Sequence, residues 1–99
     1  MVKLIMTWNI REGKENECVE FLTHDFVKDT LDMGIQPTDA WYAVWGRGPQ
    51  VLVGGVAQDM DAMDKALASN LWKAFQEKLA RIAVNFEHKV VDTSGGFQL

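Results

Sequence analysis

The chain has 99 residues, of which 47% are hydrophobic and 24% charged, a composition typical of a globular domain and not of a disordered or fibrous protein. Fourteen acidic and ten basic side chains give a net charge of −4, and no dense Lys/Arg cluster occurs, so we expect no nucleic-acid partner. The length predicts a single domain over residues 1–99, with its core in residues 2–92 and a loose tail in residues 93–99.

The single cysteine and the polar start of the chain bear on its compartment. Cys18 has no second cysteine with which to form an internal disulfide, which favours a reducing, cytoplasmic setting. Asn9, Arg11 and Glu12 interrupt the apolar N-terminus too early for a membrane span or a signal peptide. We therefore expect a soluble protein without a membrane partner.

The first two elements are a strand and a long helix. Residues 2–10 alternate, with Val2, Leu4, Met6, Trp8 and Ile10 on one face, which predicts a strand. After Gly13, a helix is expected to run to Gly34, with Val19, Leu22, Phe26 and Met33 forming its apolar stripe and Cys18 and Phe21 beside them. Gly34 is the expected left-handed residue that ends this helix.

The middle of the chain predicts a hairpin. A strand over residues 39–45 carries apolar side chains on both faces, and a second strand follows over residues 50–57. Residues 46–49, Gly-Arg-Gly-Pro, supply the turn between them. Gly54-Gly55 removes two side chains within the second strand, which leaves room for a ligand or a neighbouring tryptophan.

The last third predicts helix and then strand. Asp59 or Asp61 is expected to cap one helical segment and Ser69-Asn70 a second one, as two short helices or one kinked helix. Residues 84–92 then complete a β-α-β-β-α-β order. This order predicts an α+β fold with a four-stranded antiparallel sheet in the order 4-1-3-2 and both helical segments on one face. Since the strands are apolar on both faces, we expect a homodimer that buries the helix-free face.

No sequence motif names a reaction or a metal. His24 and His88 lie on different elements, without further histidine or cysteine at metal-ligand spacing, so no metal site is expected. The acidic residues near Asp59 lack the glycine and glutamate of a calcium loop, and Cys18 is expected to be a core residue. The remaining signal is aromatic: Trp41 and Trp45 share a strand face, a pattern that indicates either packing in a core or the wall of an apolar ligand cavity.

Two polar residues complete the predicted cavity. Asn9 lies at the end of the first strand and is the candidate for a hydrogen bond to a substrate oxygen. His88 is the candidate for proton transfer, because imidazole titrates near neutral pH. His88 shares a face with Phe86 and Val90, and if that face packs under the helices, His88 cannot reach the cavity.

The element order, with Trp8-Asn9 and Leu71-Trp72-Lys73-Ala74-Phe75, resembles the dimeric α/β-barrel superfamily, ferredoxin-like subunits that include relatives of the antibiotic-biosynthesis monooxygenases. The resemblance covers roughly residues 2–92. It implies catalytic use of an Asn on the first strand, matched by Asn9, and of a Trp on the second main helix, matched by Trp72. Members that degrade haem also use a His further along that helix. No His occurs between Lys73 and Ala83, which argues against haem, and we expect no cofactor.

Three readings of function remain open from the sequence. The first is a dimeric barrel that binds a small apolar or aromatic molecule through Asn9, Trp41, Trp45 and Trp72. The second is a cofactor-independent monooxygenase-like enzyme in which Asn9 and His88 are catalytic, and the third is a structural or interaction module without catalysis. The sequence leaves undecided whether the protein is an enzyme.

Overall fold

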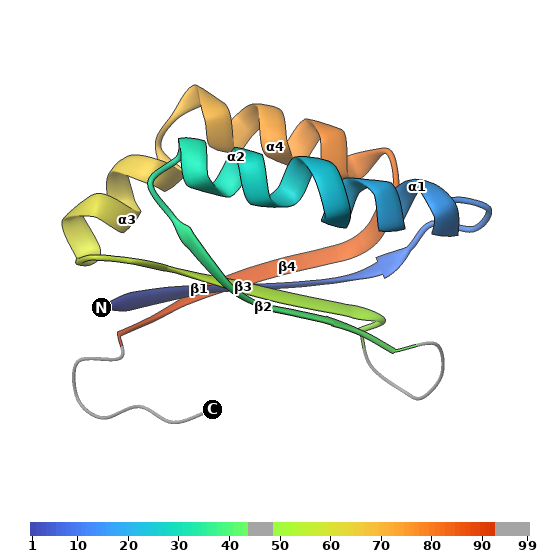
Figure 1. The fold of residues 1–99 in the computed structure, drawn as a ribbon, viewed down its shortest axis with the longest axis horizontal. Coiled ribbons are helices and arrows are strands. Elements are labelled where there is room, and N and C mark those ends of the chain that lie inside the picture. Colours follow the sequence, from blue (N-terminus) through green and yellow to red (C-terminus); the bar gives the residue numbers. More distant parts are fainter. Residues whose placement is uncertain (44–48, 93–99) are drawn as a thin grey trace.

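The computed structural model describes residues 1–43 and 49–92 and consists of one sheet with a helical layer on one of its faces (Figure 1). The strands are β1 (Val2–Ile10), β2 (Gln36–Tyr42), β3 (Val51–Ala57) and β4 (Ala83–Asp92). The first helical connection contains α1 (Glu15–Glu20), the π-helix η1 (Phe21–Asp25) and α2 (Phe26–Asp32), and the second contains α3 (Met60–Leu67) and α4 (Asn70–Ala80).

The sheet has the predicted topology. Its strand order is β2-β3-β1-β4, and β1 pairs antiparallel with both β3 and β4, while β2 pairs antiparallel with β3. This is the predicted order 4-1-3-2 read from the opposite edge. The helices cover a single face (Figure 1), so the α+β architecture is confirmed. The other face of the sheet, which we call the open face, carries no helix among the described residues.

The core lies between the sheet and the helices. The alternating residues of β1, namely Val2, Leu4, Met6, Trp8 and Ile10, are all buried there. Aromatic rings from the helices and from β4 surround Trp8, including Phe21 at 6.3 Å and Phe86 at 6.4 Å between ring centroids. The predicted inward face of β1 is therefore confirmed.

A π-turn changes the apolar stripe of the first helical connection. In η1 the N–H of Phe26 donates to the carbonyl of Phe21, five residues back, which accommodates one extra residue in the turn. Phe21 and Phe26 consequently both face the core, although their spacing of five does not fit an α-helix. The predicted placement of Val19 on the stripe is wrong, since 56% of Val19 is exposed, and Cys18 and Phe21 are buried in its place.

The ends of the helices follow the predicted signals. Gly34 has a φ of +84° just beyond α2, the conformation expected of the residue that terminates a helix. Asp59 caps α3 by accepting a hydrogen bond from the N–H of Ala62 (2.8 Å), and Ser69 caps α4 by accepting one from the N–H of Trp72 (3.3 Å). The second helical connection is thus two short helices.

The strand boundaries differ modestly from the prediction. β2 begins at Gln36, three residues before the predicted start, and ends at Tyr42. Trp45, most of the predicted turn over residues 46–49 and the predicted loose tail over residues 93–99 lie outside the described residues.

An irregularity in β4 sets which side chains of that strand face the helices. Thr7 of β1 pairs with Glu87, but Asn9 pairs with Val84, so β4 holds one extra residue at this point. Asn85 takes a φ of +58° there, a left-handed conformation that asparagine adopts more readily than most residues. Because the bulge absorbs the extra residue, Ala83, Phe86 and His88 lie on the helix-covered face of the sheet.

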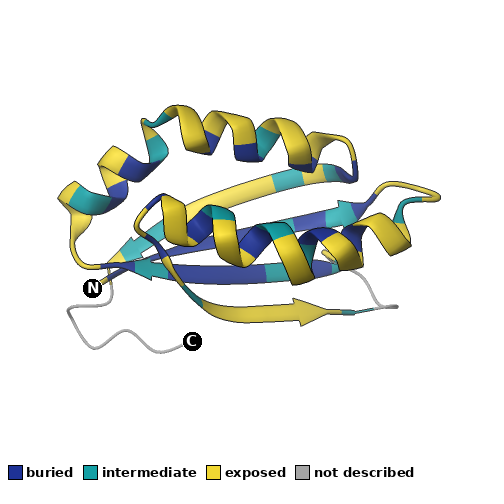
Figure 2. Cartoon of the chain, turned by 45° about the horizontal axis from the view of Figure 1, so that its top comes forward, coloured by how far each residue is buried: buried dark blue, intermediate teal, exposed yellow. Residues whose placement is uncertain are grey.

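The edge strand β2 is the least covered part of the sheet (Figure 2). Trp41 is 62% exposed and Tyr42 is 40% exposed, and they point to opposite faces of the strand. The sequence predicts that both faces of this strand are buried. Within the described chain, Trp41 and Tyr42 are exposed on its two faces.

Candidate functional site

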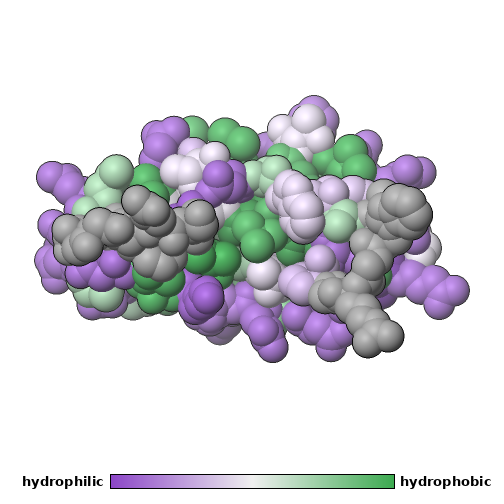
Figure 3. Space-filling view, turned by 90° about the horizontal axis from the view of Figure 1, so that it is seen from below, coloured by the Kyte–Doolittle hydropathy of each residue, from purple (hydrophilic) through white to green (hydrophobic). Residues whose placement is uncertain are grey.

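The open face of the sheet combines apolar and polar side chains in cross-strand rows. One row runs from Glu87 through Thr7 and Leu52 to Trp41, and the next runs from Lys89 through Ile5 and Gly54 to Asp39. Seen from this side, hydrophobic residues gather near the middle of the molecule and hydrophilic residues lie along its rim (Figure 3). The arrangement is that of a binding surface with polar groups around an apolar centre.

Two hollows indent this face, one toward each edge of the sheet. The larger hollow, about 800 Å³, lies along β2 and is lined by Thr38, Asp39, Ala40, Trp41 and Leu52. The smaller one, about 270 Å³, lies along β4 and is lined by Ile5, Thr7, Glu87, His88 and Lys89. Both are shallow and open, so a single chain does not enclose a ligand here.

An ion pair crosses the open face from β1 to Asp39, at the end of the second row. Lys3 of β1 reaches over β3 and donates to Asp39 Oδ2 of β2 at 2.5 Å, and Thr38 Oγ1 donates to the same oxygen at 3.1 Å. The side chain of Lys3 is only 9% exposed, whereas that of Asp39 is 46% exposed. The hydrogen bond from Lys3 holds the pKa of the Asp39 carboxyl below its usual value.

Gly54 makes this crossing possible. A Cβ at Gly54 would lie 2.9 Å from Lys3 Cε and 3.3 Å from Asp39 Oδ2, so any larger residue would displace the ion pair. On the other face of β3, a Cβ at Gly55 would lie 2.6 Å from Ile35 Cγ2. The space left by the two glycines is therefore filled by Lys3 and Ile35, and by neither a ligand nor a tryptophan.

Asn9 lies on the open face, where its side chain holds two strands together. Its Oδ1 accepts a hydrogen bond from the N–H of Gln50 at 3.0 Å, and Gln50 Oε1 accepts one from the N–H of Ile10 at 2.7 Å. These reciprocal bonds join the end of β1 to the residue before β3. The side-chain oxygen of Asn9 thus already accepts a hydrogen bond from the protein. The side-chain N–H₂ group of Asn9 is the part left to contact another molecule.

His88 and Trp72 come together on the opposite side of the sheet from Asn9. The Trp72 and His88 rings meet edge to face at 5.3 Å between centroids, and Phe86 stacks on His88 at 5.9 Å. Trp72 is buried at the start of α4, where it also stacks on Phe75. Although His88 borders the hollow along β4, its ring packs against helix-side aromatic residues.

The predicted site residues therefore divide between two faces. Asn9 and Trp41 share the open face, His88 and Trp72 share the helix-covered face, and Trp45 lies outside the described residues. The predicted contribution of Asn9 and His88 to one cavity stays a prediction, and in a single chain the two side chains project from opposite faces of the sheet. Sequence reasoning missed Lys3 and Asp39, whose signals are a lysine within an apolar strand and a glycine in the middle of the strand beside it.

The buried thiol near the core is shielded. Cys18 is fully buried, as predicted for a core residue. Burial raises the pKa of the Cys18 thiol, and the nearby indole N–H of Trp8 lowers this pKa in part. The geometry of that contact falls short of a hydrogen bond.

Within residues 1–43 and 49–92, no cluster of three or more His, Cys, Asp or Glu side chains is placed to hold a metal ion. In the same residues, no helix is both long and apolar enough to cross a bilayer.

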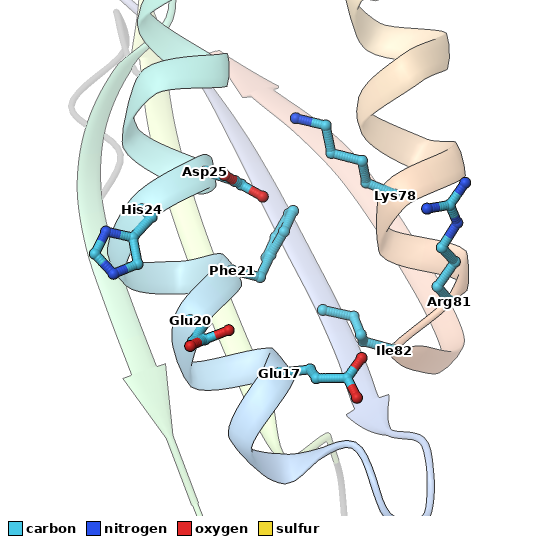
Figure 4. A pocket seen from close by; sticks show the side chains of 8 residues that line it. All are labelled: Glu17, Glu20, Phe21, His24, Asp25, Lys78, Arg81 and Ile82. Carbon is cyan, nitrogen blue, oxygen red and sulfur yellow. The ribbon is translucent and has the colours of Figure 1, made fainter.

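Another concavity lies in the helical layer, between the first helical connection and α4 (Figure 4). It has a volume of about 310 Å³. We call it the interhelical groove. Its floor contains Phe21 and Ile82, its acidic wall Glu17, Glu20 and Asp25, and its basic wall Lys78 and Arg81. His24 also borders it, but in Figure 4 the imidazole points away from the gap.

Comparisons with known proteins find similarity in structure only. No protein-family model and no curated protein matches the chain. HapK from Hahella chejuensis superposes with a TM-score of 0.78 at 12% identity over 100% of this chain and 98% of that one. A proposed antibiotic biosynthesis monooxygenase from Deinococcus radiodurans gives 0.75 at 13% identity over 100% and 98%. An uncharacterised NIPSNAP domain protein from Burkholderia xenovorans gives 0.69 at 14% identity over 99% of both chains. The chain therefore has the ferredoxin-like α+β fold of the monooxygenase-like and NIPSNAP proteins, as its resemblance to that superfamily predicts.

Proposed function

We propose that the protein is a homodimer in which two open faces enclose a cavity that binds a small apolar or aromatic molecule. The observation that carries this proposal is Trp41. It is a large side chain that is 62% exposed, lines the 800 Å³ hollow and belongs to the open face. An isolated tryptophan in water is not unusual, but this one lies beside half-buried Leu52 in its cross-strand row, with Ile5 in the next row.

Burial energetics support a partner on this face. Covering the exposed part of Trp41 removes roughly 100–150 Å² from water, which contributes about 3 kcal/mol per chain. A two-fold axis through the open face brings the same surface of each chain against the other, so this contribution counts twice. Tyr42, on the other face of β2, is 40% exposed, but among the Phe, Tyr and Trp side chains of the described residues Trp41 is the most exposed, and it belongs to the open face.

The chemistry of the face supports an apolar or aromatic ligand. Leu52, Ile5 and Trp41 supply apolar walls, while Thr7 and the amide of Asn9 supply a few polar contacts nearby. The charges of Lys3 and Asp39 compensate each other, so the centre of the face attracts neither cations nor anions strongly. Pockets for small molecules are commonly built in this way, with apolar walls and few polar groups.

The geometry does not favour the monooxygenase-like reading in its predicted form. Asn9 and His88 project from opposite faces of the sheet, and the His88 ring packs against Trp72 and Phe86, so a single chain does not direct both side chains at one bound molecule. Catalysis is accordingly no part of the proposal. A third reading, an interaction module without a ligand, differs from the proposal only in whether the cavity binds anything.

Sedimentation velocity and calorimetry with 2-naphthol test the proposal. At micromolar concentration the protein should sediment as two chains, and 2-naphthol should bind saturably and quench tryptophan fluorescence. Trp41→Ala should weaken this binding about fivefold or more, because aromatic contacts of this kind contribute about 1 kcal/mol and more. Leu71→Ala is the matched control and should leave the affinity unchanged, since Leu71 is an exposed apolar side chain on α4, in the helical layer.

Each contrary result has a distinct meaning. A monomer at micromolar concentration contradicts the proposal as a whole. A dimer that does not bind 2-naphthol contradicts the ligand cavity and leaves the interaction module. Loss of affinity in Leu71→Ala with an unchanged Trp41→Ala places the site in the helical layer.

A further inference from the structure

The interhelical groove has charged walls that do not neutralise each other. Lys78 pairs with Asp29 of α2 at 2.8 Å, which bridges the two helical segments at one end of the groove. Glu17 pairs with Lys14 on its own segment at 3.2 Å. Among the described residues, Glu20, Asp25 and Arg81 make no ion pair with their side chains. Within the described chain, the groove thus presents unpaired carboxylates on one wall and an unpaired guanidinium on the other.

The floor between these walls is apolar. Phe21 is 5% exposed and Ile82 is 6% exposed, so each offers a small apolar surface at the bottom of the groove. In Figure 4, Phe21 and Asp25 project from the first helical connection toward the gap and Lys78 extends toward it from α4, while the side chain of Arg81 runs along the side of α4 that is farther from the first helical connection. An apolar chain lying on this floor would have carboxylates at one end and would reach the Arg81 guanidinium only by extending across α4.

The π-helix gives the groove its shape. Phe21, His24 and Asp25 all belong to η1, so the one irregular turn of the first helical connection coincides with the groove. Phe21, at one end of this turn, lies on the floor, and Asp25, at the other end, is half-buried on the wall. π-turns within α-helices occur frequently at functional sites.

We propose that the interhelical groove binds a zwitterion whose ammonium and carboxylate groups are separated by a chain of several methylene groups. The ammonium group pairs with Asp25 and Glu20, the carboxylate pairs with Arg81, and the methylene chain covers Phe21 and Ile82. Packed helices have axes about 8–10 Å apart, so the two charges of an α-amino acid are too close together to reach both walls. This site is separate from the open face and does not depend on the proposed dimer.

The probes are 6-aminohexanoate, hexanoate and hexylamine, which share a methylene chain and differ in their charges. Each is titrated into ¹⁵N-labelled protein, and affinity is read from amide shifts. 6-Aminohexanoate should shift residues 17–25 and 78–82 saturably and bind about two- to fivefold more tightly than either singly charged probe, the range expected for one exposed ion pair.

Two variants separate the contributions of the walls. Arg81→Gln should reduce the affinity for 6-aminohexanoate to that for hexylamine and leave hexylamine binding unchanged. Asp25→Asn should weaken both 6-aminohexanoate and hexylamine and leave hexanoate unchanged or tighter. Lys65→Gln is the matched control, because Lys65 is an exposed cation on α3, 79% exposed and outside the groove lining.

Three outcomes overturn the inference. They are the absence of saturable shifts, equal affinity for the three probes, and shifts that cluster on the sheet instead of on residues 17–25 and 78–82. An equal effect of Lys65→Gln and Arg81→Gln also overturns it, since that would indicate a general charge effect.

Discussion

Gly54 and Gly55 are adjacent glycines with different neighbours, and the difference decides what each tolerates. Beyond Gly54 lies the flexible end of the Lys3 side chain, which can move aside. A Cβ added to Gly55 would meet Ile35 Cγ2 and, at 3.1 Å, the backbone carbonyl oxygen of Gln36, and neither can move far within the core. The same substitution therefore has a different cost at each position.

We predict that Gly55→Ala lowers the free energy of unfolding by about 1–3 kcal/mol, the usual cost of overpacking a core. Gly54→Ala should lower it by less than about 1 kcal/mol, because alanine also reduces the entropy of the unfolded chain. Urea denaturation of both variants and the wild type measures the difference. Equal destabilisation by the two substitutions would contradict the contacts described for Ile35.

The Lys3–Asp39 pair makes stability depend on pH in a defined direction. The pKa of Asp39 is lowered in the folded protein, first by the hydrogen bond from Lys3, relative to a usual value of 3.8. The pair therefore stabilises the fold above about pH 4, and this contribution is lost as the pH falls through the folded pKa. Since Asp39 is 46% exposed, solvent screens the interaction and the effect stays below about 1 kcal/mol.

The expected result is a difference between the wild type and Lys3→Met that narrows as the pH decreases from about 5 to about 3. Lys3→Met keeps an apolar stem over Gly54 and removes only the charged end of the side chain. Denaturation midpoints at several pH values measure this. A constant difference across that range would show that the ion pair does not respond to protonation of Asp39.

At the scale of elements, the second helical connection depends on its caps. Ser69 Oγ accepts from the N–H of Trp72 and donates to the carbonyl of Ala66 at 2.6 Å, so one hydroxyl joins the end of α3 to the start of α4. Ser69→Ala should cost about 1 kcal/mol of stability, measured by thermal or urea denaturation. Ser69→Asp preserves an acceptor at the cap and should recover most of the loss. Equal destabilisation by Ser69→Ala and Ser69→Asp would show that the loss of stability does not come from the missing cap.

The π-turn explains both a success and a failure of sequence reasoning. The buried positions 18, 21, 26, 30 and 33 are spaced by three, five, four and three residues, and all five residues are buried in the structure. A regular α-helix has only spacings of three and four between core-facing residues. Assuming one predicts that Val19 and Leu22 face the core, and it does not place all five buried residues on one face. The spacing of five between Phe21 and Phe26 is the signal of the π-turn in the sequence.

We predict that deletion of Thr23 is tolerated, whereas deletion of Lys28 is not. Removing one residue from η1 converts the spacing of Phe21 and Phe26 to four, which a regular α-helix can present to the core. Removing Lys28 from α2 instead rotates Thr30 and Met33 by about 100° away from the sheet, which costs several kcal/mol of burial. Circular dichroism and urea denaturation compare the two deletions. Equal loss of stability would mean that the π-turn is required for folding.

For the whole molecule, the sequence predicts the topology better than the site. The element order specifies the sheet order and the single helical layer because few connections are sterically and topologically allowed. The face occupied by His88 depends on the bulge at Asn85, which the alternating pattern of residues 84–92 does not reveal. The Lys3–Asp39 pair depends on the register of three strands, and a sequence without structure supplies no register.

The molecule exposes apolar residues on two sides, and only one of them belongs to the proposed dimer interface. Trp41 lies on the open face, whereas Val27 lies on the outer side of α2 and is 44% exposed. Both positions are solvent-accessible in a single chain, so a lysine at either is compatible with folding. The two positions differ only in which surface would meet a partner.

We predict that Trp41→Lys dissociates the dimer, while the matched control Val27→Lys does not. A lysine at position 41 would place a charge without a counterion in the apolar interface, once in each chain of the two-fold dimer. Burying an unpaired charge costs several kcal/mol. The loss of the buried Trp41 surface adds about 3 kcal/mol per chain. Sedimentation equilibrium at micromolar concentration should therefore give one chain per particle for Trp41→Lys and two for Val27→Lys. The reverse pattern would move the interface to the helical layer and leave the open face free, and a ligand would then have to bind to a single sheet.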